Sequence, residues 1–275
     1  MIGQKNLIGR IEHLIDNNNF PRFSILVGPR GSGKKTLVLY IAKYMKISWA
    51  HLLDVKIDTI RDVIVQAYKV SSPIIYLIPD ADTMSNAAKN ALLKVTEEPP
   101  NNAYFIMTLE DENNTLETIR SRGTVFHMDR YTPDEIASYF YEEYHANNGK
   151  PEEDIIRAIC ETPGEVDLLS NIDNKNYIQE FYDYVQLVVD NIAEVSLANA
   201  FKIPSKVALK DTDEGYDLRL FWKAFMKVCF ETKIGYKNWG LAVEVTSNYL
   251  QKLGVKGINR QMLIDNWLLE IRELW

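Results

Sequence analysis

The sequence Gly28-Pro29-Arg30-Gly31-Ser32-Gly33-Lys34 lies between the apolar segment Phe23–Val27 and the helical pattern Lys34–Met45. A glycine-rich loop between a strand and a helix turns its backbone N–H groups around phosphate oxygens, and its lysine reaches the outer phosphates. The segment therefore predicts a phosphate-binding loop at the edge of a parallel sheet. A chance glycine-rich turn is the alternative, and the flanking strand and helix argue against it.

The first half of the chain alternates short apolar runs with helical patterns, which is typical of a parallel sheet with crossover helices. The expected strands are Phe23–Val27, Ile74–Ile78, Tyr104–Leu109 and Thr124–Met128. The expected helices are Leu7–Asn17, Lys34–Met45, Thr59–Tyr68 and Ala87–Thr96, each with apolar residues at spacings of three and four. These segments predict an α/β core over residues 1–130.

The second half of the chain shows helical patterns, and strand signals stop at the capping-box sequence Thr132-Pro133-Asp134-Glu135. The expected helices are Asp134–Tyr144, Glu152–Glu161, Val166–Asn171, Tyr177–Asn191, Leu218–Phe230, Trp239–Leu253 and Gln261–Trp275. We expect a small helical domain over residues 131–173 and a larger one over residues 174–275. The larger domain holds four of the five tryptophans. They predict an aromatic bundle core, with a partly exposed face for oligomer contact as the alternative.

Composition excludes several classes of protein. The formal net charge of −7 argues against coating DNA by bulk electrostatics, so any DNA contact must come from a local surface or a partner. Cys160 and Cys229 are too few and too far apart for a disulfide framework or a metal cluster, and we expect reduced cysteines and no metal site. No stretch approaches the roughly 20 consecutive apolar residues of a membrane span. We therefore expect a cytoplasmic protein without membrane contact.

The loop departs from the usual pattern after its lysine. Lys35 stands where a Ser or Thr hydroxyl would hold Mg²⁺, and Thr36 comes one residue too late. We expect ATP or ADP as the ligand and weak Mg²⁺ binding. A sharper hypothesis gives the Lys35 ammonium the place of the cation; a solvent-facing lysine is the alternative. The candidate nucleotide contacts are Gly28, Pro29, Arg30, Gly31, Ser32, Gly33, Lys34, Lys35 and Thr36.

A second motif ends the apolar run Ile74–Ile78 with Pro79-Asp80-Ala81-Asp82, where a Walker B motif belongs. It is followed by Ala87-Ala88-Lys89-Asn90-Ala91-Leu92-Leu93-Lys94-Val95-Thr96-Glu97-Glu98-Pro99-Pro100. Together these stretches resemble the AAA+ subunits of bacterial clamp loaders, the gamma/tau and delta-prime subunits of DNA polymerase III. The family typically shows Asp-Glu-Ala-Asp at the strand end. Pro79, which cannot ligate a metal, and the shorter Asp80 replace the first two acids.

The resemblance covers about the first 170 residues and implies an AAA+ core, a small helical lid and a helical collar. It places Ile2-Gly3-Gln4 near adenine and Thr108 at the sensor 1 position. Thr118-Ile119-Arg120-Ser121-Arg122-Gly123 is similar to the family's Ser-Arg-Cys motif, whose arginine enters the neighbouring subunit's nucleotide site. Arg122 is thus a candidate finger, with an ordinary salt-bridged arginine as the alternative. Asp167 occupies the sensor 2 position, where competent members carry arginine.

Three departures, at Lys35, Pro79 and Asp167, fall on groups that act on the phosphates or on Mg²⁺, and predict slow or absent hydrolysis at this chain's own site. A spoiled site with a retained finger resembles the delta-prime role, with Arg122, Asp80 and Thr108 as candidate catalytic residues. The family's zinc module is absent, which makes a compact, phage-encoded version plausible.

The resemblance implies a hetero-oligomer with other clamp-loader subunits, a sliding clamp and primer-template DNA. Ser85, Asn86 and Lys89 are candidate DNA contacts at the start of a helix, with helix capping by Ser85 as the alternative. Two other functions stay open. One is an active DNA-dependent ATPase that uses Lys34, Asp80, Thr108 and a neighbour's Arg122. The other is a regulatory nucleotide switch or scaffold outside replication.

Overall fold

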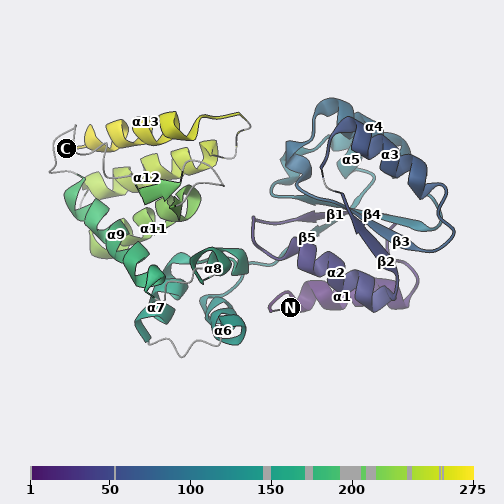
Figure 1. The fold of residues 1–275 in the computed structure, drawn as a ribbon, viewed down its shortest axis with the longest axis horizontal. Helices are drawn as coiled ribbons and strands as arrows, with labels where there is room; N and C mark the ends of the chain where they lie inside the picture. The colour runs from purple at the N-terminus through teal and green to yellow at the C-terminus, as the bar shows by residue number, and fades with distance from the viewer. Residues whose placement is uncertain are drawn as a thin grey trace. The chain divides into compact units, whose positions relative to one another are not determined.

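The computed structural model describes residues 2–52, 54–144, 150–170, 176–192, 206–208, 215–233, 237–253, 255 and 257–275. The chain divides into two compact units, Met1–Tyr131 and Thr132–Trp275, which are the purple-to-blue and the teal-to-yellow parts of Figure 1. The first unit ends at Tyr131, and the expected α/β core ends at residue 130. The expected boundary between lid and collar, at residues 173–174, lies outside the described residues, so that division stays a prediction.

The first unit is built on one parallel sheet of five strands in the order β2-β3-β4-β1-β5. The strands are β1 (Phe23–Val27), β2 (Ser48–His51), β3 (Ile74–Ile78), β4 (Ala103–Leu109) and β5 (Thr124–His127). Four of them confirm the sequence prediction. The sequence missed β2, an edge strand whose residues are mostly exposed and which therefore lacks the apolar run that marks the inner strands.

Helices cover both faces of this sheet, α1 and α2 on one side and α3 and α4 on the other (Figure 1). The helices are α1 (Lys5–Asp16), α2 (Lys34–Met45), α3 (Ile57–Ala67), α4 (Asn86–Glu97) and the short α5 (Glu117–Arg120), with 3-10 turns at η1 (Ala81–Thr83) and η2 (Glu112–Asn114). The four longer helices confirm the predicted ones with small shifts at their ends. The sequence did not predict α5 or the two turns, which are too short to show a period.

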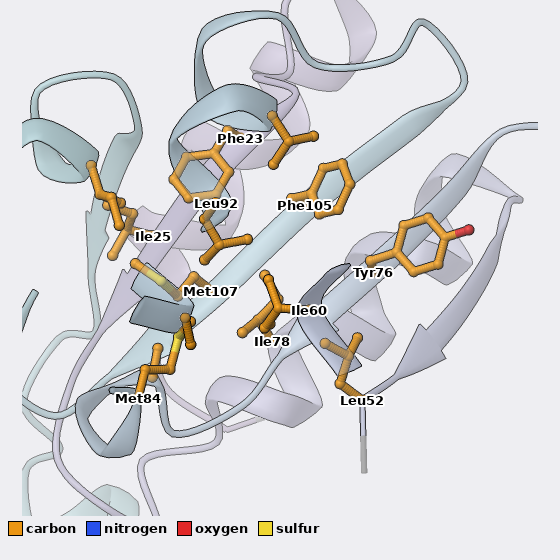
Figure 2. Close-up of a cluster of buried hydrophobic side chains, with 14 of the residues drawn as sticks. Phe23, Ile25, Leu52, Ile60, Tyr76, Ile78, Met84, Leu92, Phe105 and Met107 are labelled. Atoms are coloured by element: carbon orange, nitrogen blue, oxygen red, sulfur yellow. The ribbon is translucent and has the colours of Figure 1, made fainter. Parts of the chain in front are cut away.

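Successive strand residues point into two separate hydrophobic clusters, as the pleat requires. Leu26 and Ile106 join α1 and α2, whereas Ile25, Phe105 and Met107 join α3 and α4. Figure 2 shows the second cluster, in which Ile25, Ile78 and Met107 extend from neighbouring strands. Because both faces are buried, the sheet is a rigid support for the loops at its carboxyl edge.

The second unit is mostly helical. It contains α6 (Pro133–Tyr144), α7 (Lys150–Ile159), α8 (Pro163–Ser170), α9 (Tyr177–Asn191), α11 (Leu218–Thr232), α12 (Lys237–Lys252) and α13 (Arg260–Arg272). Two-residue strands β6 (Val207–Ala208) and β7 (Tyr216–Asp217) pair in parallel, which the sequence prediction missed because segments this short carry no alternation. The capping box is confirmed: Glu135 N–H donates to Thr132 Oγ1, and Thr132 N–H donates to the Glu135 carboxylate.

Large aromatic residues contribute to the core of this unit, as predicted, and two of its four tryptophans are among them. Trp222 and Trp267 are fully buried, with ring centroids 5.9 Å apart. Trp239 and Trp275 pack edge to face at 4.7 Å, and Trp275 remains 45% exposed. Cys160 and Cys229 are free and buried, and burial raises the pKa of both thiols, that of Cys229 to about 12. Among the helices in the described ranges, none has the length and apolar character to cross a membrane.

Candidate functional site

The glycine-rich loop joins the carboxyl end of β1 to the start of α2, the edge at which open parallel sheets bind ligands. Gly31 and Gly33 have φ angles of 78° and 85°, in the left-handed region that glycine adopts without strain. Gly28 is required for a different reason, because an added Cβ would lie 2.7 Å from Cβ of Met128. The sequence thus folds this segment as predicted, with its backbone wrapped at the N-terminus of α2.

Lys34 lies over this loop. Its ammonium donates to the carbonyl oxygens of Gly28 at 2.6 Å and Pro29 at 3.0 Å. Burial is the main cause that lowers the pKa of Lys34, and the carboxylates of Glu110, Asp80 and Asp82 oppose that shift. Sequence reasoning missed Glu110. Its position directly after β4, at the same edge as Asp80, was the signal that could have found it.

The loop is walled by the chain's N-terminal segment and by the residues after β5. Gln4 is buried, donates from Nε2 to the carbonyl oxygen of Asp129 at 2.8 Å and accepts from the Asp129 N–H at 2.7 Å. The hydroxyl of Tyr131 donates to the carbonyl oxygen of Ser32 at 2.8 Å. Ser32 Oγ is buried and has no hydrogen-bond partner within the described part of the chain. An unpaired polar atom in a phosphate loop fits a loop whose ligand is an oxyanion.

Lys35 and Thr36 are exposed on the first turn of α2. His51, at the carboxyl end of β2, is their neighbour across this edge: burial lowers the pKa of His51, and the Lys35 charge adds to that effect while Asp80 opposes it. Sequence reasoning missed His51 because it missed β2. Lys35 therefore faces solvent beside the edge strand, in line with the alternative of a solvent-facing lysine.

Asp80 contacts Thr108 through its backbone. The Asp80 N–H donates to Thr108 Oγ1 at 3.0 Å, and Thr83 Oγ1 donates to the Asp80 carbonyl at 2.8 Å. These bonds hold Asp80 at φ 44° and ψ 46°, a left-handed conformation that costs a non-glycine residue free energy. The structure thus brings together two of the three candidate catalytic residues, Asp80 and Thr108, and Asp80 is exposed.

The residues at this edge do not fit a magnesium ion. Asp82 accepts hydrogen bonds from the backbone N–H groups of Glu110 at 2.8 Å and Asp111 at 3.3 Å, and from Asn114 Nδ2 at 3.1 Å. Its carboxylate is thereby used to shape the loop after β4. Pro79 supplies no ligand at all. Lys35 stands in place of the hydroxyl, and the carboxylates of Asp80 and Glu110 both lie near the charge of Lys34.

Arg122 follows α5 and is tied to α4. Its Nη2 lies 2.8 Å from Glu97 Oε1, and its Nη1 donates to the carbonyl oxygen of Thr118 at 2.8 Å. Its side chain is 36% exposed. Among the contacts within the described residues, none joins Arg122 to the phosphate loop of the same chain. A residue that acts on the nucleotide site of another subunit does not need such a contact.

The three candidate DNA contacts differ in their surroundings. Ser85 Oγ accepts from the Ala88 N–H at 3.2 Å and so caps α4, while Asn86 is exposed on the first turn. Lys89 is buried, and its ammonium donates to the carbonyl oxygen of Asn114. The capping interpretation of Ser85 thus describes a real contact, and Lys89 stabilises the loop after β4.

Asp167, in the second unit, is held by two tyrosines. Its Oδ1 accepts from the hydroxyl groups of Tyr139 at 2.8 Å and Tyr144 at 2.7 Å. Burial raises the pKa of Tyr144, and the hydrogen bond to Asp167 raises it further. The residue at the expected sensor 2 position is therefore a structural hydrogen-bond acceptor that joins α6 to α8.

The fold, the loop and the strand-end residues define an AAA+ P-loop protein. Residues 50–132 match the family model described as DNA polymerase III, delta subunit. The replication factor C small subunit of Haloarcula marismortui is 27% identical over 149 residues, which is 50% of this chain and 46% of that protein. The DNA polymerase III subunit delta' of Haemophilus influenzae is 31% identical over 88 residues, 31% of this chain and 27% of that protein.

A solved structure adds evidence on the fold. The superposition on the DNA polymerase III gamma subunit-related protein of Thermotoga maritima covers 97% of this chain and 98% of that protein's chain. The TM-score is 0.54 and the sequence identity is 16%. The chain thus has the AAA+ fold and resembles clamp-loader subunits in sequence, and the expected resemblance and fold class are confirmed. It spans about half the length of the archaeal relative that it matches.

Proposed function

We propose that this chain is a delta-prime-like clamp-loader subunit that gives Arg122 to a neighbour's nucleotide site and hydrolyses ATP slowly or not at all at its own. The observation that carries the proposal is the arrangement at the carboxyl end of β3. Pro79 replaces an acid there, and Asp82 is bonded to the loop after β4. A subunit of this kind would keep an exposed finger, and Arg122 is exposed just after α5.

The proposed ligand of the loop is ATP or ADP bound with little help from Mg²⁺. Gly31 and Gly33 give the backbone its inward turn, and Lys34 already lies at the loop with two carbonyl partners. Exchanging these neutral carbonyl acceptors for a phosphate replaces hydrogen bonds between a charge and a dipole with hydrogen bonds between two opposite charges. The carboxylates of Asp80 and Glu110 near Lys34 work against this exchange, so the affinity should be modest.

The proposed partners are the other loader subunits, a sliding clamp and primer-template DNA, in a hetero-oligomer. The formal charge of −7 leaves DNA binding to a local surface. Ser85 and Asn86, at the N-terminus of the 12-residue helix α4, are the residues best placed for backbone phosphates. Lys89 would have to leave Asn114 to take part, so we assign it a smaller role.

Turnover by the isolated chain tests this proposal. We expect ATP hydrolysis no faster than that of the Lys34→Ala variant, together with ADP binding that Lys34→Ala removes. Robust turnover that depends on Lys34 would favour the alternative of an active DNA-dependent ATPase. The contact between Asp80 and Thr108 would then belong to its active site. Nucleotide binding without assembly with any loader ATPase from the same genome would favour a regulatory switch outside replication.

A further inference from the structure

Arg122 is held at two points that belong to different helices. Glu97, the last residue of α4, accepts from one terminal nitrogen of the guanidinium, and the carbonyl oxygen of Thr118, on α5, accepts from the other. Because the guanidinium is planar, hydrogen bonds at both of its ends favour one direction of the side chain. Thr118 supplies its contact from the backbone, so Glu97 is the only one of the two partners whose side chain sets this geometry.

The carboxylate of Glu97 is carried on a rigid base. Ser85 caps α4 at its start, and the helix packs on the sheet through Ala88, Leu92 and Val95, each at most 1% exposed. Beyond its end, the Glu98 carbonyl oxygen accepts at 2.9 Å from the hydroxyl of Tyr68, which directly follows the neighbouring α3. The end of α4 is therefore fixed on both sides of Glu97.

The ion pair is open to solvent, with the side chains of Arg122 and Glu97 36% and 54% exposed. Exposed ion pairs contribute little to stability, so this contact does not trap the guanidinium. The ion pair with Glu97 narrows the range of directions in which the long Arg122 side chain points. A nucleotide phosphate, which carries more negative charge than the Glu97 carboxylate, can then replace that carboxylate as the partner of the guanidinium.

From this geometry we infer that Glu97 is a positioning residue for the Arg122 finger. This inference rests on the proposed function, since it concerns the reaction at the nucleotide site of the neighbouring subunit. Glu97 touches no reacting group; it presents Arg122 in the orientation from which the guanidinium reaches the transferring phosphoryl group. Its removal should slow the chemical step while leaving nucleotide affinity unchanged.

The test measures ATP turnover by the assembled loader, with the full chain as wild type, Glu97→Gln, Glu98→Gln, Arg122→Ala and Glu97→Gln/Arg122→Ala. Glu98 is exposed next to Glu97, so Glu98→Gln makes the same change in charge one residue away. We expect Glu97→Gln to lower kcat about five-fold with KM for ATP unchanged, and Glu98→Gln to have no effect. The double variant should match Arg122→Ala, because a positioning residue has nothing left to position.

Ionic strength gives a readout that a purely structural role would not move. Salt screens an exposed pair, so the difference between wild type and Glu97→Gln should shrink as salt rises while both remain assembled. Equal losses in Glu97→Gln and Glu98→Gln, or a further loss in the double variant, would overturn the inference. If Arg122→Ala slows turnover and Glu97→Gln does not, this inference fails and the proposed function stands. If Arg122→Ala has no effect, the proposed function itself fails.

Discussion

The backbone N–H of Asp80 donates to the hydroxyl of Thr108, 3.0 Å away, and so joins the ends of two neighbouring strands. Thr108 is buried, and Asp80 is in a left-handed conformation that needs such support. The Thr108 hydroxyl, at the expected sensor 1 position, therefore accepts from the backbone of the segment that follows β3. This relationship makes Thr108 a residue on which local stability depends.

Thr108→Val should lower the free energy of unfolding by about 1–2 kcal/mol, because the shape is kept and the Asp80 N–H loses its acceptor. Urea denaturation followed by far-ultraviolet circular dichroism measures the change. Asp80→Gly in the Thr108→Val background should recover part of the loss, since glycine adopts this conformation without strain. An unchanged midpoint in Thr108→Val would show that the bond contributes nothing.

Two lysines of α11, Lys223 and Lys227, should differ in how much their ion pairs contribute to the free energy of unfolding. Lys223 Nζ lies 2.6 Å from Glu165 Oε1 and 2.7 Å from Glu161 Oε2, and the Glu165 side chain is only 10% exposed. Lys223→Met leaves that carboxylate without its cationic partner, although the Glu161 N–H still donates to it, and should cost up to about 3 kcal/mol. The control is Lys227→Met on the same helix, whose exposed pair with Glu231 should be worth less than about 1 kcal/mol.

This difference should depend on pH. Burial lowers the pKa of Lys223, but the charges and hydrogen bonds of Glu165 and Glu161 outweigh it, so the pKa lies above the ordinary 10.5. A raised folded-state pKa means that the stabilisation is complete below the unfolded-state pKa and is lost as pH rises through the folded-state value. Wild type and Lys223→Met should thus differ in stability at neutral pH and converge in strongly alkaline solution. A constant gap across that range would contradict the pairing.

Burial and the hydrogen bond to Asp167 both contribute to the raised pKa of Tyr144. Burial is the main cause that raises the pKa of Tyr144, and the hydrogen bond to Asp167 is the next. Asp167→Asn should lower this pKa and still leave it above the ordinary value near 10, since burial remains. Ultraviolet difference titration against Tyr144→Phe isolates the signal. A Tyr144 titration identical in wild type and Asp167→Asn would remove Asp167 from this role.

The magnesium ligands can be restored by substitution. Lys35→Ser/Pro79→Asp supplies a hydroxyl and a carboxylate at the positions where the structure has neither, and should make ADP affinity rise on adding Mg²⁺. Wild type should bind ADP equally well with Mg²⁺ and with EDTA. Calorimetric titration measures both, and Lys35→Ala serves as the control for loss of the lysine alone. A magnesium requirement in wild type would contradict our reading of Asp82 and Pro79.

The inner strands and the long helices could be predicted from sequence because each has its own apolar pattern, as Phe23–Val27 and Lys34–Met45 show. The loop could be predicted because its glycines and lysine are consecutive. The edge strand Ser48–His51 could not, since it is short, exposed and paired on one side only. His51 was missed along with it.

The remaining site contacts depend on pairings between distant segments. Gln4 reaches Asp129, Asp82 accepts from the loop after β4, and Glu97 meets Arg122, each at a separation along the chain that no local pattern records. Sequence placed Arg122, Asp80 and Thr108 as candidates by resemblance, and the structure shows their neighbours. Their catalytic roles stay predictions.

The most direct test of the central claim is ATP turnover by the mixture of this chain with the loader ATPase of the same genome, its clamp and primed DNA, comparing wild type with Arg122→Ala. We predict that turnover appears only in the mixture, falls at least about 1,000-fold with Arg122→Ala, and is unaffected by Lys34→Ala in this chain. Turnover by the isolated chain that is lost with Lys34→Ala and kept with Arg122→Ala would contradict the account.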